Sequence, residues 1–151
     1  MKALTLTQPW ASLVALGHKR VETRSWATNY RGPLAIHAAK GFPASARDFA
    51  SEERALGRLP ERLPLGAIVA VAVVTDVGRT EHISPVISAL ERHLGDYTPG
   101  RYAWMLRNIR PLPEPVPLMG RLGLFHVPGD TYLRIVHDLL VSSATEPHEG
   151  L

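Results

Sequence analysis

Residues Gly17–Trp26 read GHKRVETRSW and gather basic and acidic side chains and a tryptophan in one short run. The glycine at its start is typical of the position just after a helix, because glycine adopts the left-handed conformation without strain. Beyond it the chain should become extended, with Glu22 and Arg24 on one face of a strand and Val21 and Thr23 on the other. We therefore expect a helix, a turn and a short strand that brings charged side chains together.

The rest of the chain divides into short strands and helices at its glycines and prolines. Alternating or continuous apolar residues predict strands over Lys2–Thr7, Pro33–Ala38, Ala67–Val77, Gly100–Ile109 and Gly123–Val127. Apolar stripes predict helices over Gln8–Leu16, Pro43–Leu56, Ile83–Leu94 and Thr131–Val141. Thr7 and Ser84 are expected as caps, and Glu53 is expected on the polar side of its helix.

The order of these elements favours an α+β fold. Ala67–Val77 is apolar on both faces over most of its length, which predicts a central strand. The prolines within Pro111–Pro117 predict an extended segment that cannot be a central strand. Strands and short helices alternate unevenly, so we expect a small, mostly antiparallel, closed β-barrel with short helices packed around it. Residues 1–128 should form this domain, residues 129–141 a C-terminal helix packed on it, and residues 142–151 a flexible tail.

The composition is that of one globular domain of 151 residues, of which 45% are hydrophobic and 21% charged. The absence of cysteine excludes a disulfide framework, a thiolate nucleophile and cysteine-based zinc sites. The N-terminus does not read as a signal peptide, and the longest apolar run, Ala67–Val74, is too short to span a bilayer. We therefore expect a cytoplasmic protein without a membrane partner. The net charge of +3 permits nucleic-acid binding without predicting it.

Lys19, Glu22 and Arg24 are the first candidates for chemistry. A Glu22 carboxylate held between Lys19 and Arg24 would have its negative charge stabilised. Conversely, a partly buried Lys19 could lose its proton and act as a base or a nucleophile. The alternative is a surface cluster of ion pairs beside a turn, which would contribute little to stability.

A second set combines aromatic and basic side chains: Trp10, Trp26, Tyr30, Arg31, Lys40, Arg101, Tyr102 and Trp104. Aromatic stacking, together with arginine or lysine contacts to phosphates, is how proteins hold single-stranded RNA or flipped bases. Trp10 and Trp104 could instead be core residues. The histidines are scattered without paired spacing, so we expect no metal site, and nothing in the sequence predicts a cofactor.

The segments QPWASLVALGHKRVETRSW and YRGPLAIHAAKG resemble the ASCH domain family. The family signature is roughly G-x-K-x-x-E-x-R, and Gly17, Lys19, Glu22 and Arg24 match it position by position. The later segment GDYTPGRYAWMLRNIRPLPEPVPLMG is similar to the C-terminal half of small stand-alone bacterial members. The resemblance therefore extends to about Val127.

The resemblance implies a PUA-like fold, in which the signature residues line a cleft between a β-barrel and a helix. Because related PUA-like domains bind RNA or modified nucleobases, it also implies a site for RNA, single-stranded nucleic acid or a modified nucleoside at Lys19, Glu22 and Arg24. By charge, ring type and position we extend this set to Trp26, Tyr30, Arg31, Lys40, Arg101 and Tyr102.

Enzymatic activity is the open alternative. Some family members resemble ribonucleases, and one branch hydrolyses the acetyl amide of N4-acetylcytidine with the signature lysine, a threonine three residues later and a distant glutamate. Position 22 of this chain is a glutamate, and no residue aligns with the distant one, for which Glu81 and Glu91 are the candidates. A metal-independent hydrolase, either a ribonuclease or an amidohydrolase, could use Lys19 and Glu22 as an acid–base pair. A protein-interaction module that docks through Pro111–Pro117 is the second alternative.

Overall fold

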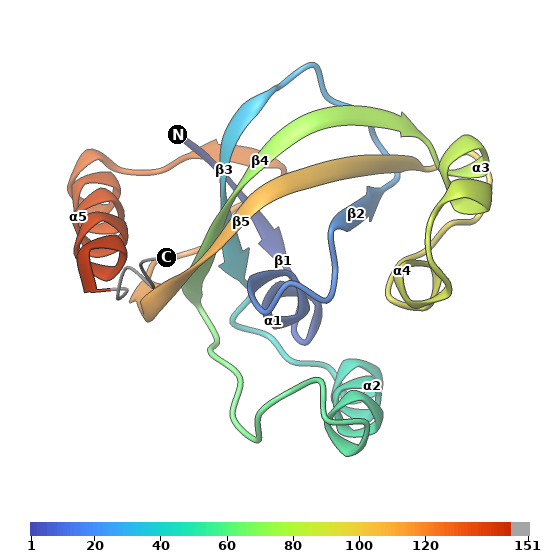
Figure 1. Ribbon diagram of the computed structural model, residues 1–151, viewed down its shortest axis with the longest axis horizontal. Coiled ribbons are helices and arrows are strands. Elements are labelled where there is room, and N and C mark those ends of the chain that lie inside the picture. The colour runs from blue at the N-terminus through green and yellow to red at the C-terminus, as the bar shows by residue number, and fades with distance from the viewer. Residues whose placement is uncertain (146–151) are drawn as a thin grey trace, which may run out of the picture.

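The structure is a computed structural model and describes residues 1–145. Its strands are β1 (Lys2–Leu6), β2 (Val21–Arg24), β3 (Gly32–Ala38), β4 (Ala67–Arg79), β5 (Tyr102–Pro117) and β6 (Leu124–His126). Its helices are α1 (Trp10–Ala15), α2 (Ala44–Ala55), α3 (Thr80–Ile83), α4 (Ala89–His93) and α5 (Gly129–Thr145), with a 3-10 turn, η1, at Ser84–Val86. Figure 1 shows the long strands arching over α1, with α5 at one side of the sheet. In this part of the chain, every helix is too short or too polar to cross a membrane.

The strands form one curled sheet in the order β2-β5-β4-β3-β1-β6. Only β1 and β3 run parallel among the neighbouring pairs, and β4 lies centrally between β3 and β5, as its apolar faces predict. The register between β4 and β5 shifts repeatedly, and such bulges bend a strand. The predicted α+β, mostly antiparallel architecture is confirmed. The sheet is a half-barrel and not a closed barrel, because β2 and β6, the two end strands among residues 1–145, do not pair with each other.

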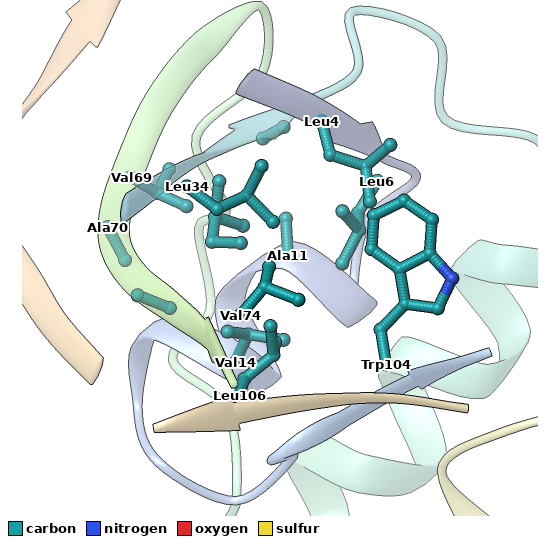
Figure 2. Close-up of a cluster of buried hydrophobic side chains, with 13 residues drawn as sticks. Leu4, Leu6, Ala11, Val14, Leu34, Val69, Ala70, Val74, Trp104 and Leu106 are labelled. Atoms are coloured by element: carbon teal, nitrogen blue, oxygen red, sulfur yellow. The ribbon is translucent and has the colours of Figure 1, made fainter. Parts of the chain in front are cut away.

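The two faces of the sheet carry separate hydrophobic cores. Alternation along β1 sends Leu4 and Leu6 to the concave face and Ala3 to the opposite face. The concave core contains the fully buried Trp104 and the inner side of α1, as Figure 2 shows. The outer core packs against Ile135 of α5. Burying one large apolar side chain contributes about 1.5–3 kcal/mol, so these cores fix both helices on the sheet.

The predicted helix Ile83–Leu94 is wrong in its continuity. Ile87 and Ser88 have extended backbone conformations, which separate η1 from α4. Ser88 then begins α4, because its hydroxyl accepts a hydrogen bond from Glu91 N at 3.1 Å. The cap predicted at Ser84 is therefore replaced by Ser88.

Two further expectations about helices are corrected. Thr7 does not cap α1; the Gln8 side chain instead accepts a hydrogen bond from Ser12 N at 3.0 Å. Glu53 is not on the solvent side of α2 but is fully buried. Its carboxylate is compensated there by an ion pair with Arg58 and a hydrogen bond with His93 of α4.

The proline-rich segment continues β5 beyond its predicted end at Ile109. It pairs with β4 as far as Pro117, which lies opposite Ala67. β2 covers only Tyr102–Met105, so the prolines have a neighbouring strand on one side, in agreement with the expectation that they cannot be central. This pairing gives the prolines a structural role and offers no support for a docking surface.

The C-terminal helix α5 spans Gly129–Thr145 and is longer than the predicted Thr131–Val141. An Arg110 guanidinium nitrogen on β5 donates to Leu139 O of α5 at 3.0 Å, which ties the helix to the sheet. The helix continues to Thr145, so residues 142–145 of the expected tail are helical. The remainder of that tail lies outside the described residues.

Candidate functional site

The signature run forms a turn and then β2, an edge strand of the sheet. Gly17 follows α1 at a φ of +80°, and His18 N and Lys19 N both donate to Leu13 O at 3.0 Å. The chain then pairs with β5 alone, so that Glu22 lies opposite Trp104. The predicted helix, turn and strand are confirmed.

The Glu22 carboxylate lies between two cations. Its Oε1 is 3.7 Å from Lys19 Nζ, and its Oε2 is 3.5 Å from an Arg24 guanidinium nitrogen. Lys19 Nζ also donates to Val21 O. Lys19 is 1% exposed and Glu22 is 8% exposed, so the alternative of a solvated surface cluster is wrong. Lys19 instead supports the carboxylate from inside the protein.

Glu22 and Arg24 line a cleft with a volume of about 400 Å³. The cleft is lined by residues of β1, the start of α1, α2, β2, the end of α4 and the segment that follows it. Arg24 Nη2 donates to Thr5 O at 2.6 Å, which fixes the guanidinium group against β1. Lys19 is not a lining residue, because it lies behind Glu22.

A second arginine reaches the same cleft from the residue before β5. Arg101 Nε is 3.4 Å from Asp96 Oδ2, and its Nη2 donates to Thr23 O at 3.4 Å. Hydrogen bonds from Thr98 lower the pKa of Asp96, and the charge of Arg101 adds to this effect. A guanidinium has five N–H donors, so Arg24 and Arg101 keep donors for a bound anion beyond these contacts.

The cleft also has an aromatic wall, of which the sequence analysis named only Trp10. Trp10 stacks on Phe49 with ring centroids 5.2 Å apart and an interplanar angle of 19°. His93 lies 5.3 Å from the same Phe49 ring at an angle of 36°. Trp10 is half-buried and lines the cleft. It is therefore not solely the core residue that its position in the apolar stripe of the helix suggests.

His93 is held by the buried carboxylate of α2. His93 Nε2 is 2.8 Å from Glu53 Oε1, and Arg58 Nε donates to Glu53 Oε2. Burial opposes ionisation of Glu53, but the hydrogen bonds from Arg58 and His93 outweigh it and lower the pKa of this carboxyl. The sequence offered no signal for this arrangement, because His93 and Glu53 are far apart in the chain and neither belongs to a motif.

Several predicted residues do not line the cleft: Trp26, Tyr30, Arg31, Lys40 and Tyr102. Trp26 and Tyr102 pack against the concave core instead, and Trp26 meets the Trp104 ring edge-on at 4.9 Å. The Tyr30 hydroxyl donates to a backbone carbonyl of β3, and Arg31 lies 3.8 Å from a β4 carboxylate. Lys40 is exposed beyond β3. Neither nearness in sequence to the signature nor ring type therefore predicted which side chains line the cleft.

The two glutamates considered as a distant catalytic carboxylate also lie outside the cleft lining. Burial raises the pKa of Glu91 against the opposing effects of Arg20 N, which donates to it at 2.6 Å, and of the Lys19 charge. Glu81 accepts a hydrogen bond from Gly100 N at 3.1 Å, which lowers its pKa. Both therefore hold neighbouring backbone in place. Within residues 1–145, no group of three or more potential metal-ligating side chains occurs.

The signature and much of the cleft lie in a region that matches a known domain family. The model of the ASCH domain family matches residues 4–114, a stretch that begins within β1 and ends within β5. The chain belongs to the ASCH domain family. The signature at Gly17, Lys19, Glu22 and Arg24 and both arginines of the cleft lie within the matched region.

Curated relatives of this ASCH domain match over a shorter stretch. Activating signal cointegrator 1 of Homo sapiens is 54% identical over 41 residues, which are 27% of this chain and 7% of that protein. The Mus musculus protein of the same name matches equally. The chain thus spans a small part of the length of these relatives.

Solved structures share the fold. The crystal structure of ASCH from Zymomonas mobilis superposes with a TM-score of 0.57 at 14% identity, covering 90% of this chain and 93% of that chain. A mutant form of the same protein gives a TM-score of 0.56 at 15% identity, covering 90% and 96%. At this identity the likeness concerns the fold alone.

Proposed function

We propose that this ASCH domain binds RNA, single-stranded nucleic acid or a modified nucleoside in the cleft beside β2. One observation carries the proposal: the stacked pair Trp10–Phe49 and the arginines Arg24 and Arg101 line the same cleft. A nucleobase has an apolar face that stacks on an aromatic ring, while its phosphate accepts hydrogen bonds from guanidinium groups. This combination fits a nucleotide better than it fits a purely apolar or a purely anionic ligand.

Glu22 and Lys19 have different parts in this proposal. Glu22 lines the cleft, and an ionised carboxylate only accepts hydrogen bonds, so it suits an N–H or hydroxyl group of the ligand. Lys19 is 1% exposed and donates to Val21 O, so it acts as a positioning residue that holds Glu22. The same burial argues against Lys19 as a group that attacks a substrate, and the hydrolase alternative has less support for that reason.

Salt-dependent binding tests the proposal. A fluorescently labelled single-stranded RNA should bind at low salt, and removing one phosphate contact should reduce the slope of log affinity against log salt by about 0.7. We expect this reduction in Arg24→Ala and in Arg101→Ala. Arg134→Ala is the matched control, because Arg134 lies on α5 and pairs with Asp138 at 3.8 Å, away from the cleft.

Two results would contradict the proposal. One is no binding of RNA, single-stranded DNA or a panel of modified nucleosides at low salt. The other is a slope that both cleft variants leave unchanged from that of wild type. RNA cleavage that is abolished in Lys19→Ala, with the fold intact, would favour the hydrolase alternative instead.

A further inference from the structure

The Glu53–His93 pair joins two helices at the edge of the cleft. Glu53 of α2 is fully buried, whereas the His93 side chain at the end of α4 is 48% exposed and lines the cleft. Nε2 of His93 is bound to Glu53 at 2.8 Å. Among residues 1–145, the other ring nitrogen, Nδ1, has no hydrogen-bond partner, so it is available to a ligand in the cleft.

The carboxylate fixes which nitrogen of His93 carries the hydrogen. Glu53 is kept ionised by Arg58 and His93, and an ionised carboxylate can only accept. Nε2 must therefore be the protonated nitrogen, and in the neutral ring Nδ1 is left as a hydrogen-bond acceptor. The hydrogen bonds that link Arg58, Glu53 and His93 thus leave Nδ1 of His93 as a hydrogen-bond acceptor at the cleft wall.

The aromatic wall brings a ligand alongside this group. His93 lies 5.3 Å from Phe49, and Phe49 stacks on Trp10, so a base that stacks on this wall has its edge near the imidazole. We propose that His93 is a specificity-determining residue of the cleft, which accepts a hydrogen bond from an amino group on the base edge. It selects bases with an amino group over those with a carbonyl oxygen at the same position. This inference rests on the proposed function of the cleft.

Cytidine and uridine monophosphate are suitable probes, because they carry the same phosphate and differ in an amino group against a carbonyl oxygen. In titration calorimetry at about pH 8, wild type should bind the cytidine nucleotide roughly fivefold more tightly, the effect of one net hydrogen bond. His93→Ala should give a ratio near one.

Glu53→Gln is the second variant, because a glutamine side chain can either donate to Nε2 or accept from it and so no longer fixes the tautomer. It should reduce the preference while both nucleotides still bind. His82→Ala is the control, since His82 is exposed on α3 and does not line the cleft. Its ratio should equal that of wild type.

Equal affinities in wild type at pH 8, or a preference that survives in His93→Ala, would overturn this inference and leave the proposed function intact. Failure of both nucleotides to bind wild type would also overturn it. The salt titration with RNA then shows separately whether the proposed function fails with it.

Discussion

Lys19 is the residue whose charge holds the cleft carboxylate in place. It is almost fully buried and lies 3.7 Å from Glu22. Removing one partner of a buried ion pair costs about 3 kcal/mol or more when the remaining charge has no other partner. Arg24 still pairs with Glu22 in Lys19→Ala, so we expect a loss at the lower end of this range. Lys19→Ala should therefore lower the free energy of unfolding by about 3 kcal/mol, as measured by urea denaturation.

The neighbouring Arg20→Ala provides the control for Lys19→Ala. The Arg20 side chain is exposed, and its backbone N–H, which binds Glu91, is retained in the variant. Its free energy of unfolding should stay within about 0.5 kcal/mol of wild type. Equal stability of Lys19→Ala and Arg20→Ala would contradict the supporting role of Lys19.

Trp10 is the residue on which the proposed base stacks. Base–aromatic stacking contributes about 1–3 kcal/mol per base, so Trp10→Ala should weaken RNA binding by roughly tenfold or more. Trp10→Phe keeps an aromatic face and should retain most of the affinity. Anisotropy titrations of the two variants at one salt concentration check this. Equal losses of affinity in both would show that stacking on Trp10 is not part of the site.

At the scale of elements, the turn between α1 and β2 depends on Gly17. Its φ is +80°, and an added Cβ would meet nothing within 4 Å, so the cost of a side chain lies in the backbone conformation alone. Gly17→Ala should reduce the free energy of unfolding by about 1 kcal/mol. Gly129→Ala is the control, because Gly129 also has open space around its Cβ position but no left-handed φ. A thermal melt in which both variants behave alike would contradict this account.

The elements that the sequence predicted are those with strong local signals. The β2 turn, the central β4 and the amphipathic α2 each follow from apolar periodicity and glycine positions. The interruption between η1 and α4 was missed because the apolar pattern of the sequence continues through it. Only the backbone of Ile87 and Ser88, which is extended, breaks the helix. The length of β5 was missed because prolines argue against strands, although a strand with one free edge tolerates them.

At the scale of the whole molecule, the site joins segments that no local pattern links. The Lys19–Glu22–Arg24 cluster lies within one run and could be predicted from its spacing. Phe49, His93 and Glu53 could not, because their meeting depends on how α2 and α4 pack beside the sheet. In Figure 1, α2 lies below α1, and α4 lies to the right of β2.

Glu53 also connects the site to the pH dependence of stability. Its pKa in the folded protein is lower than the ordinary value of 4.5. Ionised Glu53 therefore stabilises the fold fully above pH 4.5, and this contribution is lost as the pH falls below 4.5 through the folded-state pKa. Between about pH 6 and pH 3, wild type should lose more stability than Glu53→Gln, as followed by urea denaturation. Parallel losses would contradict the ion pairing of Glu53.

The most direct test of the account is to map where a short single-stranded RNA binds, by following backbone amide NMR signals of the full chain at low salt. If the cleft binds the RNA, the largest shifts fall on Thr5, Trp10, Arg24, His93 and Arg101, and α5 is unaffected. Shifts centred on α5 or on the outer face of the sheet, with the cleft unchanged, would contradict it.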